Sequence, residues 1–407
     1  MIRNSDGNGL EARLHGSPAT AAILREIVCK AGHPRVSSAR MKGLIASVAM
    51  ILLAVCVHAA PDDVSVLLEK IRDEHDVPAL AAAVMDEGKI VAFGACGMRS
   101  SGRLVPVTAD DKWHLGSCTK SMTASVAAML VEDGLIRWNT TLGEIFPDEI
   151  EDMDHAWREV TLEQLLVHRA GAPHEPPKDL YAEALKQEGE PIFQRWEFVT
   201  GLLRMRPAKP PGTHWIYSDC GYAIAGAMLE RAAGESWEEL MESRLFKPLR
   251  LKSAGFGAPA TPRKLDQPWG HRGYEPPFKP VPPGPDADYP PALGPAATVH
   301  MSIADFVRYA QWHVAGARGE GTLLKPESFR KLHTPPDGQE YAMGWAVTKR
   351  RWAGGTALMH SGDNTMFYAV MWLSPAENTC FVATCNADCV DASNACDEAV
   401  RMLINKY

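Results

Sequence analysis

The segments of this 407-residue chain that have the character of β-strands lie near its two ends, with a long helical region between them. Near the N-terminal end, small apolar residues over 79–85 and 89–95 flank an Asp-Glu-Gly turn, which predicts a β-hairpin. Nearer the C-terminus, apolar segments over 357–359, 367–373 and 379–384 are separated by turn residues and predict three more strands. Because a sheet must bury its apolar face, we expect both ends of the chain to form one antiparallel sheet with helices packed on it.

The middle of the chain, from about 135 to 290, is dominated by helical patterns and loops. This predicts a helical region inserted into the sheet domain, with a cleft between the two. A proline-rich run over 275–295 is expected to be a rigid surface loop. The fold class is therefore α+β. Helices are expected over 62–76, 117–134, 162–167, 220–233, 237–245, 302–314 and 392–405.

The charge of the chain limits which partners it can bind. Its formal net charge is -8, although residues 1–60 carry a net +4, so the remainder carries a net -12. An acidic body of this kind disfavours nonspecific binding to nucleic acid, which is itself polyanionic. Hydrophobic residues make up 46% and charged residues 23%, which is typical of a globular protein.

The N-terminal region has the pattern of a processed export signal. A positive start at Met41-Lys42 precedes an apolar stretch over 44–57, and small residues follow up to Ala59. This pattern predicts a signal peptide over 41–59, cleaved after Ala59, and an exported protein that is periplasmic or secreted. Residues 1–40 precede this start and are expected to be an extension without structure.

Two alternatives exist for this apolar stretch. A membrane anchor would need about 20 apolar residues, and the stretch is shorter than that, so we expect no stable membrane insertion after cleavage. A lipid-modified Cys56 is disfavoured because Val55 is a poor residue before such a cysteine. The folded domain is therefore expected to cover residues 62–405.

Seven cysteines follow residue 60, and an exported protein meets an oxidising compartment in which disulfides form. The four last cysteines have the spacing C-x4-C-x3-C-x6-C with no histidine among them, which matches no standard zinc pattern. Buried thiols or one local disulfide, such as Cys389 with Cys396, are expected instead. No metal site is predicted.

The first motif that carries chemistry is Ser117-Cys118-Thr119-Lys120. A serine and a lysine three residues apart at a helix start lie on the same face of the helix. The free N–H groups and the dipole of the helix start favour negative charge developing at Ser117. A lysine beside a serine can take part in activating the hydroxyl as a nucleophile. Taken alone, the same pattern is equally that of a helix-capping serine and a surface lysine.

Two later motifs fit the same chemistry. The first is Tyr217-Ser218-Asp219, in which a tyrosine near a lysine can act as general base and acid. The second is His360-Ser361-Gly362, followed by Asp363 near a C-terminal strand. A glycine there allows a substrate to approach the backbone closely. Backbone N–H groups of this strand and of Ser117 can form an oxyanion hole.

The three motifs in this order resemble the serine β-lactamase and penicillin-binding-protein superfamily. The resemblance is strongest to class C β-lactamases and to their esterase and D-aminopeptidase relatives, and it covers residues 62–405. The segments that carry it are GSCTKSMTA at 116–124, LLVHRAGAP at 165–173, PGTHWIYSDCGYAIAG at 211–226, FKPLRLKSAGFG at 246–257, YAMGW at 341–345 and HSG at 360–362.

This resemblance implies a role for each matching residue. Ser117 is implied as the nucleophile, Lys120 as its proton partner and Tyr217 as the general base. The backbone N–H groups of Ser117 and Asp363 are implied as the oxyanion hole. The substrate-binding positions of the second and third motifs are occupied by Asp219, His360 and Gly362.

Two of these residues depart from the usual pattern of the superfamily. Asp219 stands where asparagine is commoner, and an ionised aspartate accepts hydrogen bonds but donates none. It can also hold Lys120 in the protonated form. His360 stands where lysine is usual in true β-lactamases, and a neutral imidazole binds a substrate carboxylate less strongly than an ammonium does. Both departures favour an esterase or peptidase relative over an efficient β-lactamase.

The sequence therefore predicts a serine hydrolase that forms an acyl-enzyme on Ser117 and needs no cofactor or metal. Its expected substrate is a small ester, amide or peptide. The alternatives are a β-lactamase or D,D-peptidase, and a catalytically inactive sensor with the same fold. The usual G-x-S-x-G motif of α/β-hydrolases is absent from the sequence. The sequence does not indicate an oligomeric state.

Overall fold

A seven-stranded sheet organises the molecule, and the computed structural model describes residues 60–407. The strand order is β1-β3-β2-β12-β11-β10-β9, and neighbouring strands are antiparallel except β1 and β3. The strands are β1 (Asp62–Asp63), β2 (Ala79–Asp86), β3 (Lys89–Gly97), β9 (Ala346–Arg350), β10 (Gly355–Asp363), β11 (Tyr368–Ser374) and β12 (Thr379–Cys385). Pairing of β2 with β12 joins the two ends of the domain, so the predicted sheet is confirmed.

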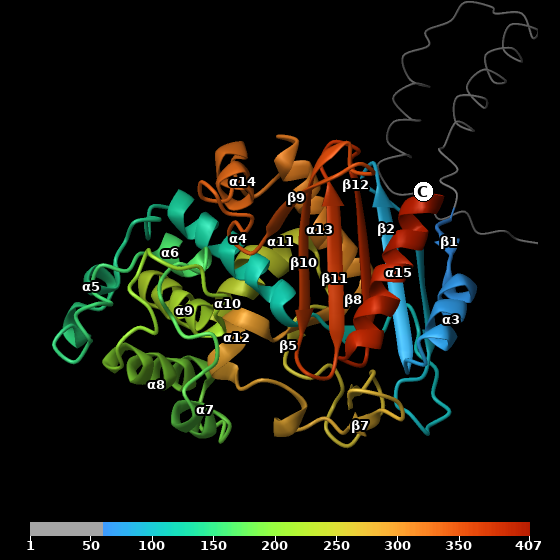
Figure 1. The fold of residues 1–407 in the computed structure, drawn as a ribbon, viewed down its shortest axis with the longest axis horizontal. Helices are drawn as coiled ribbons and strands as arrows, with labels where there is room; N and C mark the ends of the chain where they lie inside the picture. Colours follow the sequence, from blue (N-terminus) through green and yellow to red (C-terminus); the bar gives the residue numbers. More distant parts are fainter. Residues whose placement is uncertain (1–59) are drawn as a thin grey trace, which may run out of the picture. The chain divides into compact units, whose positions relative to one another are not determined.

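Helices cover both faces of this sheet (Figure 1). On one face, α3 (Ser65–Glu74) and α15 (Val390–Lys406) pack against Leu80, Ala82 and Val84 of β2. The other face packs against the larger core, to which α4 (Thr119–Glu132) and α13 (Ile303–Ala317) contribute. Because successive strand residues point to opposite faces, and both faces are covered, the whole of β2 except its last residue is buried.

Two strands of this sheet were not predicted: the two-residue β1, which lies where a helix was expected to begin, and β9, at the opposite edge of the sheet. The last residues of β9, Lys349 and Arg350, are exposed and polar, so the segment lacks the apolar run that marks the other strands. Charged side chains are common on edge strands because they discourage pairing with another chain. β9 pairs with β10 only as far as Met359, and the later residues of β10 extend beyond it.

The helix that begins after Ser117 is more deeply buried than its sequence suggested. One side, with Met122, Val126, Met129 and Leu130, was expected to face the core. Every residue from Thr119 to Leu130 is in fact buried. Helix α4 lies between the sheet domain and the helical region, which explains why it has no solvent-facing side (Figure 1).

The middle of the chain contains many helices, and two smaller sheets lie apart from the main sheet in strand order. Its helices are α5 (Leu142–Ile145), α6 (Leu162–Leu166), α7 (Lys178–Ala184), α8 (Pro191–Arg204), α9 (Asp219–Ala233), α10 (Trp237–Leu240), α11 (Lys247–Leu249) and α12 (Gly294–Ala297), with a π-helical turn over Met241–Phe246. Helix α14 (Pro326–His333) follows α13. The minor strands are β4 (Lys112–His114), β5 (Gly255–Phe256) and β8 (Val299–Ser302) in one sheet, with β6 (Gly270–Arg272) and β7 (Lys279–Val281) in another.

The proline-rich segment over 275–295 is not only a surface loop, which corrects the prediction. It contains β7 and two short 3₁₀ turns, and Ala292 and Leu293 at its end are buried. This end packs against α8 and α9. The apolar residues of its last third explain the difference, since they bury surface that a loop of prolines alone would leave exposed.

The predicted disulfide between Cys389 and Cys396 is wrong, because all seven cysteines of the described residues are free thiols. Cys389 caps the start of α15, where its Sγ accepts a hydrogen bond from the Ala392 N–H at 3.3 Å. Cys396 lies seven residues later on the same helix. A rise of about 1.5 Å per residue separates them by roughly 10 Å, which is too far for a disulfide. The expectation of buried thiols holds for the other six cysteines.

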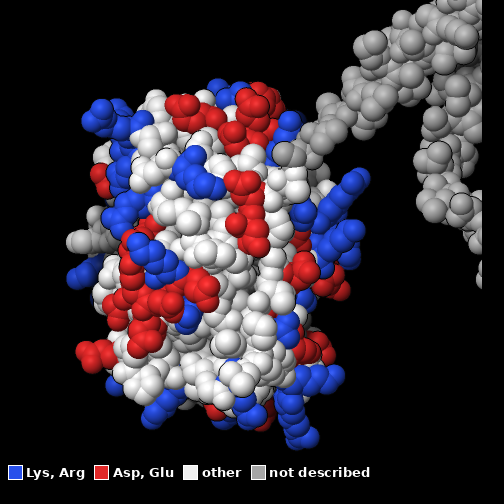
Figure 2. Space-filling model, turned by 90° about the vertical axis from the view of Figure 1, so that its right-hand side faces the viewer, with Lys and Arg blue, Asp and Glu red and all other residues white. Residues whose placement is uncertain are grey.

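The surface carries both signs of charge. On the face drawn in Figure 2, Lys and Arg side chains are interspersed with Asp and Glu, and large areas between them are uncharged. No helix among residues 60–407 is long and apolar enough to cross a membrane. The predicted signal peptide over 41–59 and the extension over 1–40 lie outside the described residues.

Candidate active site

Ser117 and Lys120 are in direct contact, as the first motif predicted. Ser117 lies in the 3₁₀ turn Gly116–Cys118, directly before α4. Gly116 has a φ of 49°, a left-handed conformation that a residue without a side chain adopts at little cost. Lys120 lies one turn further on and points the same way, so that its Nζ is 2.9 Å from Ser117 Oγ.

The ammonium group of Lys120 is fully buried and has three acceptors. Besides Ser117 Oγ, these are Asp219 Oδ1 at 2.6 Å and the carbonyl oxygen of Ala296 at 3.1 Å. Burial by itself lowers the pKa of Lys120, but the Asp219 carboxylate and Tyr217 outweigh burial and raise the pKa above its ordinary value. Lys120 is therefore held in its charged form, and all three of its N–H donors are used.

Tyr217 lies directly against this ammonium. Lys120 Nζ is 4.6 Å from the centre of the Tyr217 ring, and Tyr217 immediately precedes the residue that caps α9. Burial raises the pKa of Tyr217, the charge of Lys120 opposes that rise, and the Asp219 carboxylate adds to it. Ser117, Lys120, Tyr217 and Asp219 thus form one contiguous group of four side chains from two helix starts.

His168, which lies in the segment 165–173, packs against Tyr217. Its Nδ1 accepts a hydrogen bond from the Ser218 N–H at 3.1 Å, and its ring centre lies 4.4 Å from that of Tyr217. The ring also packs against Tyr341 at 4.8 Å and Tyr222 at 5.2 Å. Burial lowers the pKa of His168 well below its ordinary value, so the imidazole is neutral and can accept this hydrogen bond.

Gly362 makes room for the backbone of the nucleophile's turn, a role that was not predicted for it. A Cβ at this position would lie 2.3 Å from the Leu115 carbonyl oxygen and 2.4 Å from the Ser117 nitrogen. Likewise, a Cβ on Gly116 would lie 2.3 Å from the Asp363 nitrogen. Two glycines therefore bring the backbones that carry the predicted oxyanion-hole N–H groups into contact.

His360 is buried and neutral. Its Nε2 lies 2.9 Å from the hydroxyl of Tyr341, and its Nδ1 contacts the carbonyl oxygen of Ser361. Burial lowers the pKa of His360 to about 3, and the charge of Lys120 contributes to this shift. The third motif therefore contributes no positive charge at neutral pH, in keeping with the expectation that it binds a carboxylate poorly.

Two cavities meet at Ser117, Tyr217 and Asp363. The larger has a volume of about 470 Å³ and the smaller about 320 Å³. The larger cavity is further lined by His174, Glu175, Pro176, Lys178, Tyr181, Asp219, Tyr289 and Leu293. The smaller is further lined by Tyr341, Ala346, Met359, His360 and Ser361. A substrate bound across Ser117 can therefore extend in two directions.

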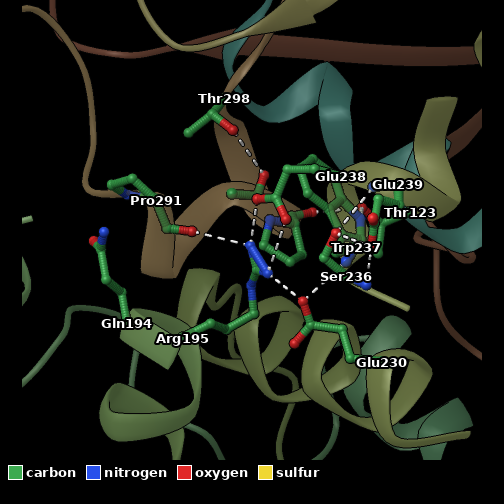
Figure 3. A network of polar contacts seen from close by, with 12 residues as sticks. Thr123, Gln194, Arg195, Glu230, Ser236, Trp237, Glu238, Glu239, Pro291 and Thr298 are labelled. Carbon is green, nitrogen blue, oxygen red and sulfur yellow. Dashed lines mark hydrogen bonds and ion pairs between the residues drawn. The ribbon is translucent and has the colours of Figure 1, made fainter. Parts of the chain in front are cut away.

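A buried ion network holds the segment that supplies the Ala296 carbonyl (Figure 3). Arg195 of α8 is fully buried and pairs with Glu230 and Glu238, and its Nη2 also donates to the Pro291 carbonyl at 3.2 Å. The charge of Arg195 is thus balanced by two carboxylates inside the helical region. This fixes the start of the segment 291–297, whose end contacts Lys120.

Thr123 fixes the same segment from the side of α4. Its hydroxyl donates to the Pro295 carbonyl at 2.7 Å, and it accepts a hydrogen bond from Trp237 Nε1 at 3.1 Å. Sequence patterns did not identify Thr123, Arg195 or Ala296. Most of their contacts join residues that are about 100 or more positions apart in the sequence. A motif with short spacing cannot reveal such contacts.

Tyr341 was also missed, although the segment 341–345 carried part of the resemblance. Its contact with His360 forms because the chain turns back at β9 onto β10. Among residues 60–407, no group of three or more His, Cys, Asp or Glu side chains is placed to hold a metal ion.

The Beta-lactamase family model matches residues 64–403. The chain belongs to this family. It is 31% identical over 258 residues to penicillin-binding protein 4 of Amycolatopsis lactamdurans, covering 63% of this chain and 65% of that protein. It is 30% identical over 193 residues to lovastatin esterase of Penicillium rubens, covering 44% and 48%. The matches span less than two thirds of the length of both relatives.

The fold itself is shared with solved structures. A D-stereospecific amidohydrolase from Streptomyces superposes with a TM-score of 0.65 at 20% identity, covering 84% of this chain and 98% of that one. At this level of identity the likeness concerns the fold alone. The predicted fold class and superfamily are confirmed.

Proposed function

We propose that this protein is a serine hydrolase that forms an acyl-enzyme on Ser117 and hydrolyses an ester or amide bond. The observation that carries the proposal is the contact between Ser117 Oγ and Lys120 Nζ at 2.9 Å, at the meeting point of two cavities. The adjoining backbones of Gly116 and Asp363 support it, because they bring together the N–H groups that an oxyanion requires.

In the proposed acylation, Ser117 Oγ bonds to the substrate carbonyl carbon and its proton passes to the ionised Tyr217. The negative charge on the carbonyl oxygen is stabilised by the N–H groups of Ser117 and Asp363. Cleavage of the carbonyl's bond to the leaving group follows, and Tyr217 returns the proton to that group. Water then repeats the sequence to release the acid. Lys120, which remains an ammonium, stabilises both the Tyr217 anion and the attacking oxygen.

The charges of the cleft favour substrates without a carboxylate. His360 is neutral, and Asp363 supplies the one carboxylate among the residues that line the smaller cavity. Three carboxylates, those of Glu175, Asp219 and Asp363, line the larger cavity together with one lysine, Lys178, so the carboxylates outnumber the lysine there. An anionic substrate would be repelled by these carboxylates, so we rank esters and amides before β-lactams and D,D-peptides. One of the two relatives is named an esterase and the other a penicillin-binding protein, so their names do not by themselves decide between these substrate classes.

The experiment compares turnover of p-nitrophenyl acetate with turnover of a chromogenic cephalosporin, with Ser117→Ala as the blank. We expect ester turnover that the blank lacks, and kcat/KM for the cephalosporin at least about tenfold lower. Faster cephalosporin turnover would make the protein a β-lactamase. A parent that turns over neither substrate faster than the blank would be either the inactive sensor or an enzyme for a narrow peptide substrate.

The pH dependence tests the role of Tyr217. The active form has Tyr217 deprotonated, and its pKa is raised, so kcat/KM should rise about tenfold per pH unit from pH 6 to pH 9. Asp219→Asn removes a carboxylate that raises this pKa, so more Tyr217 is ionised at pH 7.5 and kcat/KM should increase roughly threefold to tenfold.

The matched control for Asp219→Asn is Asp179→Asn, which removes the same charge from an exposed position on α7. Solvent screens that charge, so the pH profile should not move. A plateau of kcat/KM between pH 7 and 8 in the parent protein would show that a group other than Tyr217 is the base.

Export remains part of the proposal. It is supported by the apolar stretch over 44–57 and the small residues that follow it. N-terminal sequencing of the protein recovered from expressing cells tests it, with Ala60 as the expected first residue.

A further inference from the structure

A buried histidine lies behind the turn that carries the nucleophile. His114 ends β4 and is fully buried. Its Nδ1 lies 3.1 Å from the Gly116 backbone nitrogen and accepts that N–H. An imidazole nitrogen that accepts a hydrogen bond carries no proton, so a neutral His114 must carry its proton on Nε2.

The proton on Nε2 is bound by Asp288. Asp288 Oδ2 lies 2.9 Å from His114 Nε2, and its side chain is 7% exposed. This contact selects the tautomer of His114 that leaves Nδ1 free to accept from Gly116. Without Asp288, the other tautomer would direct an N–H group at the Gly116 N–H, and the two donors would repel each other.

The second oxygen of the same carboxylate binds the turn that follows β10. Asp288 Oδ1 accepts a hydrogen bond from Asn364 Nδ2 at 3.2 Å. It also accepts one from the backbone N–H of the next residue, Tyr289, at 2.7 Å. Asn364 is buried and directly follows Asp363. Its own Oδ1 accepts the Phe367 N–H at 2.9 Å, which fixes the turn between β10 and β11.

We propose that Asp288 is a positioning residue that sets the spacing of the oxyanion hole. One carboxylate connects the turn before Ser117, through His114, with the turn after Asp363, through Asn364. The two N–H groups assigned to the oxyanion lie on residues adjacent to these two anchor points. This inference rests on the proposed function, because it gives Asp288 a role only if Ser117 is acylated.

The test measures the reaction of Ser117 with a fluorophosphonate, together with kcat and KM for p-nitrophenyl acetate. In the labelling reaction an O–P bond forms, fluoride leaves, the serine proton passes to Tyr217, and the phosphonyl oxygen occupies the oxyanion hole. Asp288→Asn has one acceptor fewer and places an NH₂ group against a donor. We expect the labelling rate and kcat to fall together by about 10- to 100-fold, with KM within about threefold.

Two further variants separate positioning from folding. Asn364→Ala removes the contact between Asp288 and the turn after Asp363 but leaves the His114–Asp288 pair. It should therefore lower the labelling rate about tenfold, and it provides a test even if Asp288→Asn does not fold. Asp305→Asn removes an equally buried carboxylate on α13, which binds Ser253 and Arg308 outside the cleft. It should lower the melting temperature without lowering the labelling rate.

The outcomes distinguish this inference from the proposed function. If the parent is labelled and turns over ester, but Asp288→Asn and Asn364→Ala are labelled as fast as Asp305→Asn, only the positioning role is refuted. A rise in KM with unchanged kcat would also refute it, since that is the signature of lost substrate binding. If Ser117 of the parent is not labelled at all, the proposed function fails and the inference fails with it.

Discussion

Replacement of Lys120 by methionine is expected to lower kcat/KM for p-nitrophenyl acetate by about a thousandfold or more, with KM within about threefold. Lys120 contacts the nucleophile and supplies the only positive charge in contact with both Ser117 and Asp219 among the residues described. Without it, ionisation of Tyr217 loses its stabilising charge and the serine proton has no favourable destination. Steady-state kinetics at several pH values measures the effect, which should lie in kcat.

This variant should remain folded, because methionine fills nearly the same buried volume as lysine. The Asp219 side chain is 24% exposed and can be hydrated, whereas the Ala296 carbonyl loses one donor, so we expect a loss of about 1–3 kcal/mol in unfolding free energy. Lys331→Met is the matched control. Lys331 binds Glu163 at the same 2.6 Å but lies outside the cleft. Equal activity losses in both variants would contradict a catalytic role for Lys120.

Gly362→Ala is the second change for which we expect a large effect. The new Cβ would lie within 2.7 Å of the Leu115 carbonyl oxygen and of the Ser117 and Cys118 nitrogens, which are backbone atoms that cannot turn away. The strand and the nucleophile's turn must therefore separate. We expect kcat/KM to fall about 100-fold or more, because the oxyanion hole widens, and stability to fall by about 1–3 kcal/mol. Ester kinetics and chemical denaturation measure the two effects.

Gly284→Ala is the control for this substitution. Gly284 has an extended backbone with a φ of 170°, and no atom lies within 4 Å of a Cβ built there. Activity and stability should therefore stay within about twofold and about 0.5 kcal/mol of the parent. A Gly362→Ala protein that behaves like this control would mean that the two backbones need not be in contact for catalysis.

The sequence carried enough information to predict the parts of the molecule that depend on local patterns. Alternating and apolar segments gave five of the seven strands in the main sheet, and helical spacing gave α3, α9 and α13. The Ser117–Lys120 contact followed from the geometry of a single helix turn. The edge strand β9 was missed because its polar residues lack a strand pattern, and the disulfide was wrong because the helix through Cys396 was not taken into account.

The parts that were not predicted depend on contacts between distant segments. His114 and Asp288 are 174 positions apart, so no local spacing relates them. The contact of Gly362 with the nucleophile's turn was not predicted either, since the sequence shows a glycine beside a strand but not the backbone that packs against it. The positions of Asp219 and His360 were predictable, whereas the neutral state of His360 follows from its burial and from the charge of Lys120.

The pairing of β2 with β12 has a consequence for how the protein is made. These strands are separated by almost 300 residues, so the central pair of the sheet cannot form until nearly the whole chain has left the ribosome. Closure of so long a loop is entropically costly, and topologies dominated by distant pairings fold slowly. The turn that carries Ser117 is synthesised early. Its contact with β10 forms only late, because β10 lies near the C-terminal end of the chain. Nascent chains truncated before β12 should therefore be inactive and exposed to chaperones and proteases until synthesis ends.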